Sequence, residues 1–227
     1  MKEKGMKLLC RGFLLLGLFV LWTFLVLTVD VQIAGETQTR LGFAAINCKF
    51  HELTGIHMVI YHITDWLGLV PVFVCMVFGG IGFGQLIRRK SFLQVDLDLI
   101  ALGVYYVIVI LGYLIFEMIP INYRPILIEG IKEASYPSST TLLVLGVMPT
   151  LGFQVKRRVK NECLKKMLSC FVYSFSVFMV AGRLISGVHW LTDIVGSVLL
   201  SAGLFWLYKG TTVLLDRGGE IKNHGIS

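Results

Sequence analysis

The side chains best suited to chemistry in this 227-residue chain include His189 and Asp193, which lie four positions apart near the C-terminal end. Residues at i and i+4 share one face of a helix, so the carboxylate can hold one imidazole nitrogen while the other is aimed outward. An oriented nucleophile or base needs this arrangement. The spacing therefore indicates nucleophilic or acid–base chemistry.

Two arginines could hold an anion beside this pair. Arg183 lies six residues before His189, and Arg124 begins a separate loop. Planar guanidinium groups bind phosphate through paired, charge-assisted hydrogen bonds, so two of them could approach a phosphate from different sides. These positions predict a phosphate-binding site.

A run of hydroxyl residues completes the predicted site. Ser138, Ser139 and Thr140 follow Pro137 at the start of an expected helix, where unpaired backbone N–H groups and the helix dipole favour an anion. Glu117 is a further ionisable residue near the end of an apolar segment. We expect these groups to meet in one shallow pocket.

Each residue alone also has a purely structural interpretation. Ser138 could be a helix N-cap, the two arginines could reach the membrane interface, and His189 beside Trp190 could belong to an aromatic belt. Ionisable residues near membrane depth are costly and usually face a functional cavity, which favours the joint functional interpretation.

The elements that position these residues are apolar segments. The chain is 56% hydrophobic and only 15% charged, and its mean hydropathy is +0.76, too apolar for a soluble fold of this length. A membrane-spanning helix needs roughly 20 apolar residues. The sequence predicts an all-α integral membrane bundle of six transmembrane helices at about residues 12–33, 66–87, 97–119, 137–155, 167–187 and 190–214.

The charge distribution predicts how this bundle is oriented. With cytoplasmic N and C termini, 16 of the 21 Lys and Arg residues lie inside, which agrees with the positive-inside bias. This places the site on the extracytoplasmic face of the cell membrane. Residues 34–65 then form an outer loop containing a short amphipathic helix with Phe50, Leu53, Ile56, Val59 and Ile60.

Residues 1–215 are predicted to form a single domain, followed by a disordered cytoplasmic tail at 216–227. The net charge of +7 lies in short clusters between apolar segments, which argues against a nucleic-acid partner. His51, His57 and His62, with Glu52 and Asp65, fit no standard ligand spacing, so no metal and no cofactor are expected. The oligomeric state is left open.

The motifs resemble those of the type 2 phosphatidic acid phosphatase superfamily of lipid phosphate phosphatases, in its bacterial membrane form. The clearest match is Arg183, five residues, His189, three residues and Asp193, within GRLISGVHWLTDIVG. The resemblance implies that His189 forms a phosphohistidine and that Asp193 orients it. It also implies metal-independent phosphate binding by Arg124, Arg183, Ser138, Ser139 and Thr140.

Two positions depart from the family pattern. Glu117 replaces a lysine seven residues before Arg124, and Thr140 stands where the family has a histidine that protonates the leaving group. Threonine is a poor acid near neutral pH, so the leaving group is not protonated. The rate of hydrolysis should therefore fall more for a lipid monophosphate, which expels an alkoxide, than for a lipid diphosphate, which expels a phosphate. This favours a diphosphate such as undecaprenyl diphosphate, with Glu117 as a possible accessory acid or an ion-pair partner.

Three functions stay open at this point. The chain is a lipid phosphatase, or a catalytically weakened relative that binds or transports a phosphorylated lipid, or a phosphotransferase that uses an acceptor other than water. Thr140 and Glu117 favour the second, whereas His189 and Asp193 argue against it.

Overall fold

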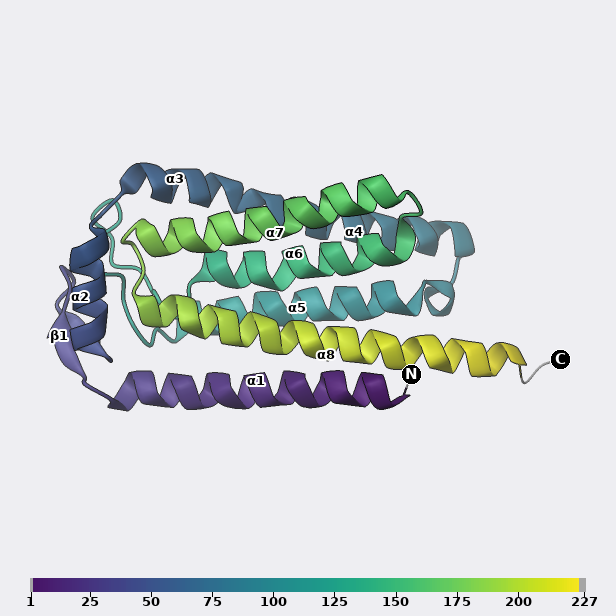
Figure 1. Ribbon diagram of the computed structural model, residues 1–227, viewed down its shortest axis with the longest axis horizontal. Coiled ribbons are helices and arrows are strands. Elements are labelled where there is room, and N and C mark those ends of the chain that lie inside the picture. The colour runs from purple at the N-terminus through teal and green to yellow at the C-terminus, as the bar shows by residue number, and fades with distance from the viewer. Residues whose placement is uncertain (1, 225–227) are drawn as a thin grey trace.

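The computed structural model describes residues 2–224, which form a bundle of long helices with a small hairpin and a short helix across one end (Figure 1). In chain order the elements are α1 (Lys2–Thr28), β1 (Gln32–Ala34), β2 (Thr39–Leu41), α2 (Ala44–Thr54), α3 (Met58–Leu67), α4 (Leu69–Arg89), the 3₁₀ turn η1 (Phe92–Gln94), α5 (Leu97–Met118), α6 (Ser139–Arg158), α7 (Glu162–Ile185) and α8 (Leu191–His224). The fold is all-α apart from the antiparallel β1–β2 pair, as the sequence predicts.

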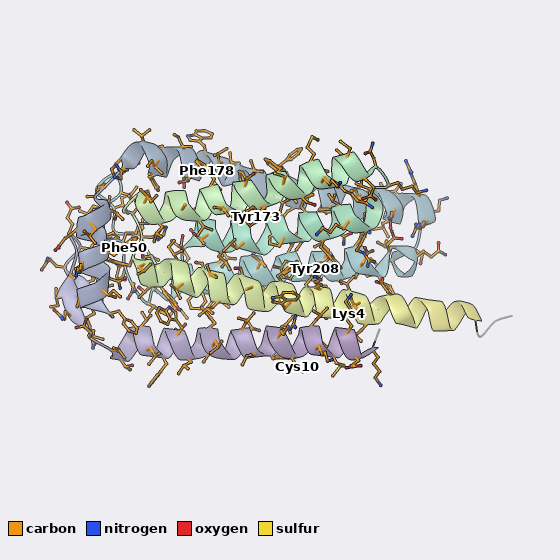
Figure 2. All side chains as sticks on the ribbon, viewed as in Figure 1. Lys4, Cys10, Phe50, Tyr173, Phe178 and Tyr208 are labelled. Carbon is orange, nitrogen blue, oxygen red and sulfur yellow. The ribbon has the colours of Figure 1, made fainter. Side chains whose placement is uncertain are left out.

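Within residues 2–224, five helical segments are long and apolar enough to cross a membrane. They are Lys2–Thr28, Met58–Arg89, Leu97–Met118, Glu162–Ile185 and Leu191–Asp216. Large apolar side chains such as Phe178 and Tyr173 on α7 point outward, where a bilayer would cover them (Figure 2). The protein is therefore a multi-pass membrane protein.

Helix α6 corresponds to the fourth expected span, at 137–155, but it is not among these five segments. It packs against α4, α5, α7 and α8, and it carries the buried polar residues Thr141, Thr150 and Gln154. Because protein rather than lipid surrounds much of α6, its side chains need not be uniformly apolar. The count of six transmembrane helices stays a prediction.

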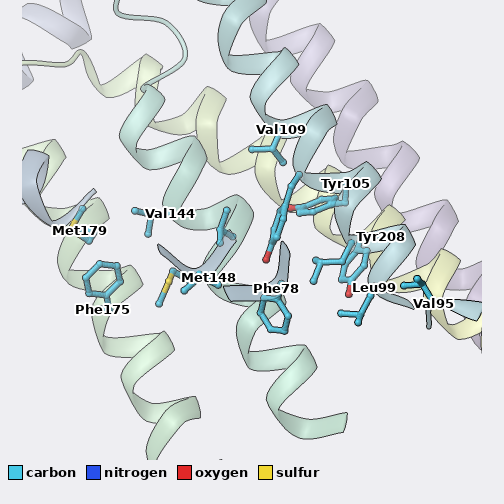
Figure 3. Packing of buried hydrophobic residues seen from close by; sticks show 14 residues of the cluster. Phe78, Val95, Leu99, Tyr105, Val109, Val144, Met148, Phe175, Met179 and Tyr208 are labelled. Atoms are coloured by element: carbon cyan, nitrogen blue, oxygen red, sulfur yellow. The ribbon is translucent and has the colours of Figure 1, made fainter. Parts of the chain in front are cut away.

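The main core lies between α4, α5, α6, α7 and α8 (Figure 3). Its polar atoms are satisfied inside the bundle. The Tyr105 hydroxyl donates to the Gly146 carbonyl at 2.8 Å, and the Gln154 side chain donates to the Tyr208 hydroxyl at 2.7 Å. Since unpaired polar groups are costly in a membrane interior, these bonds hold the helices at fixed depths relative to one another.

Helices α1 and α8 lie along each other through glycines that face leucines on the partner helix (Figure 1). A Cβ added at Gly12 would lie 2.6 Å from Leu207, and one at Gly203 would lie 2.8 Å from Leu16. Small residues let membrane helices approach closely. α1 begins and α8 ends at the same end of the bundle, opposite α2. Which side of the membrane this end faces stays a prediction.

The expected amphipathic helix within residues 34–65 is two helices, so this prediction is wrong in its extent. α2 ends at Gly55, whose φ of 70° lies in the left-handed region, and α3 begins at Met58. Ile56, Val59 and Ile60 therefore do not continue the helix of Phe50 and Leu53. Instead α3 runs into α4, while α2 lies across the end of the bundle (Figure 1).

Helix α8 continues through His224 and so includes most of the segment at 216–227 that the sequence predicts to be a tail. Residues 225–227 lie outside the described residues. The division of the chain into a domain at 1–215 and a tail stays a prediction.

Candidate active site

The turn between α7 and α8 brings His189 and Asp193 together at the α2 end of the bundle. His189 precedes the first residue of α8, and Asp193 lies in its first turn. The imidazole Nδ1 is 3.7 Å from the carboxylate Oδ2, and both side chains are buried. The two side chains are thus close, but His189 lies in the turn before α8 and not on one helical face with Asp193, because α8 begins at Leu191 and not near Val188.

Ser135 lies between the two groups and links them. Its hydroxyl donates to Oδ2 of Asp193, and its Oγ is 3.3 Å from Nδ1 of His189. The imidazole can therefore donate from Nδ1 to Ser135, which donates in turn to Asp193. With the proton on Nδ1, the other nitrogen, Nε2, keeps its lone pair.

The Asp193 carboxylate accepts further hydrogen bonds that fix its orientation. The backbone N–H of Trp190 donates to Oδ2 at 2.8 Å, and the Asn122 side chain donates to Oδ1 at 3.4 Å. Sequence reasoning missed Ser135 and Asn122. Each stands two residues before a noted position, Pro137 and Arg124 respectively, but no spacing rule singles them out.

The two arginines meet over one aromatic ring. The guanidinium carbon of Arg183 is 4.9 Å from the centre of the Tyr61 ring, and that of Arg124 is 5.7 Å from it. Both arginines are buried. Like charges repel at this range, so the electron-rich face of Tyr61 helps to hold them together. Tyr61 is a third residue that the sequence pattern did not indicate.

Each arginine also has a carboxylate neighbour. Nη2 of Arg124 is 3.0 Å from Oε2 of Glu133, and Nη2 of Arg183 is 3.6 Å from Oδ1 of Asp65. Nη1 of Arg183 also donates weakly to the Thr64 hydroxyl at 3.5 Å. The sequence analysis predicted neither carboxylate beside the arginines. Even with both of these contacts, several guanidinium N–H groups remain without a partner.

Several buried polar atoms of this site have no hydrogen-bond partner. They are Nε2 of His189, Nε and Nη1 of Arg124, and Nε of Arg183. An unpaired buried donor or acceptor costs about 1–3 kcal/mol, so native proteins rarely tolerate one without a functional reason. Three cationic donors and one imidazole nitrogen without partners fit an anion that the imidazole can attack.

Burial keeps the His189 imidazole neutral. Removal from water lowers its pKa well below the usual value, and the charges of Arg124 and Arg183 lower it further. A neutral imidazole has a free lone pair on one nitrogen, as a nucleophile requires. The arginines thus favour both the bound anion and the reactive form of the histidine.

The three hydroxyl residues take different positions. Ser138 is the buried N-cap residue of α6, and its hydroxyl donates to Thr141 at 3.1 Å. Its backbone N–H lies 3.4 Å from the Asp193 carbonyl, which ties α6 to α8. Ser139 and Thr140 are partly exposed and line a cavity of about 430 Å³ together with Asp65.

Glu117 does not join the arginines. It is exposed near the end of α5 and borders a small hollow with Tyr136, Pro137 and Ser139. Within residues 2–224, Arg124 pairs with Glu133 rather than with Glu117. The geometry therefore gives no support to an ion pair between Glu117 and an arginine of the site.

The outer histidines form no evident metal site. Across the described part of the chain, no group of three or more His, Cys, Asp or Glu residues is placed to hold a metal ion. His57 contacts the Thr54 carbonyl through Nε2 at 2.9 Å, and the His51 ring lies 5.6 Å from the Trp190 ring. Metal independence stays a prediction.

Fold and site together define a multi-pass membrane protein whose helical bundle buries a His–Asp pair beside two arginines at one end. The sequence model of the PAP2 superfamily matches residues 18–214, and the chain belongs to this superfamily. No curated protein sequence matches the chain significantly.

One solved structure has the same fold. It is the crystal structure of a transmembrane PAP2-type phosphatidylglycerolphosphate phosphatase from Bacillus subtilis, with a TM-score of 0.53 and 19% sequence identity. The match covers 88% of this chain and 95% of that one. The likeness confirms the all-α transmembrane architecture expected from the sequence.

Proposed function

We propose that this protein is a membrane lipid phosphatase that removes a phosphate through a phosphohistidine at His189. The observation that carries the proposal is the set of unpartnered buried atoms, in which Nε2 of His189 lies in one site with free N–H groups of Arg124 and Arg183. Membership of the PAP2 superfamily supports it.

In the first step, the lone pair of Nε2 attacks phosphorus. The N–P bond forms while the bond from phosphorus to the leaving oxygen breaks, and that oxygen keeps the electron pair. The imidazole becomes positively charged, and the chain from Nδ1 through Ser135 to Asp193 stabilises this charge. Arg124 and Arg183 stabilise the equatorial oxygens of the transition state.

In the second step, water attacks the same phosphorus atom from the side that the leaving group vacated. The O–P bond forms, the N–P bond breaks, and Nε2 recovers its electron pair. Inorganic phosphate leaves, and the imidazole returns to its neutral form. This sequence needs only groups of the chain, the lipid and water.

The proposed substrate is a lipid diphosphate such as undecaprenyl diphosphate. Thr140 lines the cavity beside the site where a proton donor for the leaving group would be useful, and its hydroxyl is a poor donor near neutral pH. The alcohol formed from an alkoxide is a far weaker acid than a phosphate, whose second pKa is about 6, so an alkoxide is much the poorer leaving group. A leaving phosphate therefore needs no proton donor.

The proposed location is the extracytoplasmic face of the cell membrane. The end of the bundle opposite the site carries most of the basic residues, in the groups at 2–11, 88–90 and 156–166. Basic residues favour the cytoplasmic side of a membrane, so the site at the other end faces outward.

Phosphate release by purified protein in detergent micelles tests the function. We expect release from undecaprenyl diphosphate to exceed release from phosphatidic acid, and His189→Gln to lower both by at least about 10³-fold because the nucleophile is lost. His62→Gln is the matched control, since His62 is exposed on α3. Equal rates for His189→Gln and the unchanged protein would rule out the phosphohistidine.

A lipid-binding relative is the second candidate, favoured by Thr140 at the position of the missing acid. It predicts saturable binding of a lipid phosphate without phosphate release. A phosphotransferase would instead consume the lipid and place the phosphoryl group on an acceptor, which a product assay with and without added alcohols detects.

A further inference from the structure

Hydrolysis of the proposed phosphohistidine requires a base, because attacking water must lose a proton as the O–P bond forms. The groups already described are unsuited to this task. His189 carries the phosphoryl group, and the Asp193 carboxylate accepts hydrogen bonds from Ser135, Trp190 and Asn122. The Thr140 hydroxyl is not a base near neutral pH. A further group must supply this function.

The cavity lined by Asp65, the carboxylate neighbour of Arg183, indicates where water enters. Its polar lining includes Asp65, Ser139 and Thr140, which we call its polar end, and its apolar lining includes Val72, Val109 and Leu143. Its volume of about 430 Å³ suits part of a lipid chain. The leaving lipid thus lies along these walls with its oxygen at the polar end, and water replaces it there.

Asp65 is the carboxylate at this polar end. Its Oδ1 lies 3.6 Å from Nη2 of Arg183, so it stands next to a guanidinium that binds the phosphate. A strong charge-assisted hydrogen bond is shorter, about 2.7–2.9 Å, so this contact leaves the carboxylate free to bind water. The Asp65 side chain is 55% exposed, whereas Arg183 is 1% exposed. Asp65 therefore joins the buried arginine to the open cavity.

The position of Asp65 is fixed by close packing of α3 against α7. A Cβ added at Gly182 would lie 2.6 Å from the Thr64 side chain, so any larger residue at this position would force the two helices apart. Thr64 and Asp65 are neighbours on α3, and Gly182 and Arg183 are neighbours on α7. The glycine therefore sets the distance between the carboxylate and the guanidinium.

We infer that Asp65 is the general base of the second step and accepts the proton of the attacking water. The water oxygen bonds to phosphorus, its proton moves to a carboxylate oxygen of Asp65, and the N–P electron pair returns to Nε2 of His189. Asp65 then releases the proton to solvent. This inference rests on the proposed function and explains how the site works without a histidine at position 140.

Glu133 offers a matched comparison. It also pairs with a phosphate-binding arginine, at 3.0 Å, and its side chain is 34% exposed. However, it does not line the cavity that contains Asp65 and Thr140. Glu133 is therefore expected to tune the affinity of Arg124 for phosphate without touching the attacking water.

Rapid-quench kinetics with farnesyl diphosphate labelled at its terminal phosphorus distinguishes the two steps. We expect Asp65→Asn to form the labelled phosphohistidine at nearly the normal rate and to release one farnesyl phosphate per protein in a burst. Steady-state phosphate release then falls by about 10²–10⁴-fold, the usual contribution of a general base. Glu133→Gln should change KM without accumulating the labelled intermediate.

A second variant covers the case in which Asp65→Asn does not fold. In Asp65→Ala the cavity can admit formate, and we expect formate to restore part of the turnover as an external base. If either variant slows formation of the phosphohistidine as much as its hydrolysis, Asp65 only positions Arg183 and the inference is wrong. If the unchanged protein forms no phosphohistidine and releases no phosphate, the proposed function itself fails.

Discussion

At the scale of single residues, the site combines charges that would repel or neutralise one another in water. Arg124 and Arg183 both contact the ring of Tyr61, while the side chains of their carboxylate neighbours, Glu133 and Asp65, are 34% and 55% exposed. Buried donors without partners cost free energy, and a bound phosphate would satisfy them. The same arginines lower the pKa of His189 and keep it nucleophilic.

Position 140 offers a direct test of substrate class. Thr140→His places a titratable group at the polar end of the cavity, where it can protonate an alkoxide. We expect turnover of phosphatidic acid to rise by about 10-fold or more relative to that of undecaprenyl diphosphate. This increase is smaller than a native general acid usually provides, because the surroundings of the new histidine are not adapted to it. Phosphate release from both lipids by purified protein measures the ratio.

Thr140→Asn is the control for this change, because asparagine is polar but cannot donate a proton as an acid near neutral pH. It should leave the ratio of the two rates as in the unchanged protein. If asparagine and histidine shift the ratio equally, or if the unchanged protein already favours phosphatidic acid, the absence of an acid at position 140 does not set the substrate preference.

Residue patterns predicted only part of this site. The four-residue spacing indicated His189 and Asp193 because the two residues lie on either side of the start of α8, and the arginines were recognised from their place beside apolar segments. Ser135, Tyr61 and Asp65 could not be found in this way. Their contacts with His189 and Arg183 join positions that are more than 50 residues apart, and such contacts exist only once the helices pack.

At the scale of elements, the turn between α7 and α8 holds the nucleophile by docking onto the break between α2 and α3. The His57 backbone N–H donates to the Ser186 carbonyl at 3.0 Å. Gly187 has a φ of 72°, and a Cβ there would lie 2.2 Å from the Gly55 carbonyl oxygen. Gly55 and Gly187 thus allow the two backbones to touch, and this contact sets the position of His189 relative to α2 and α3.

Gly187→Ala should therefore separate these segments. We expect the free energy of unfolding to fall by more than the roughly 1–2 kcal/mol that left-handed backbone costs an L-residue, because the backbone clash is added to the strain. Phosphatase activity should fall with it. Gly130→Ala is the matched control, since Gly130 has a φ of 77° with no atom within 4 Å of a Cβ. Thermal unfolding in detergent compares the two variants.

Equal losses of stability for Gly187→Ala and Gly130→Ala would contradict the docking of the α7–α8 turn on α2.

The element boundaries also show what hydropathy alone can predict. The apolar windows located α1, α5 and α7, but not the start of α3 within the expected outer loop. Gly55 breaks the helix there, and the contact that favours the break comes from Ser186, which is distant in sequence.

At the scale of the whole molecule, packing and charge determine different properties. Glycines on each of α1 and α8 contact leucines on the other helix, and this packing is the same whichever end of the bundle faces the cytoplasm. Only the distribution of basic residues distinguishes the two faces, with 16 of 21 Lys and Arg placed inside by the predicted topology. The fold class could thus be read from the sequence, whereas the side of the membrane requires an experiment.

Labelling of single cysteines tests the orientation. The starting protein keeps Cys163, which is exposed at the beginning of α7, and has serine at the other four cysteine positions. A second protein has serine at all five positions and carries Lys132→Cys, in the exposed loop at the site end. On intact cells, a membrane-impermeant maleimide should label the Lys132→Cys protein and should label Cys163 only after lysis. The reagent reacts only with accessible thiols. If Cys163 is labelled on intact cells and the cysteine at position 132 is protected, the candidate site lies in the cytoplasm, and an extracytoplasmic lipid phosphatase is excluded.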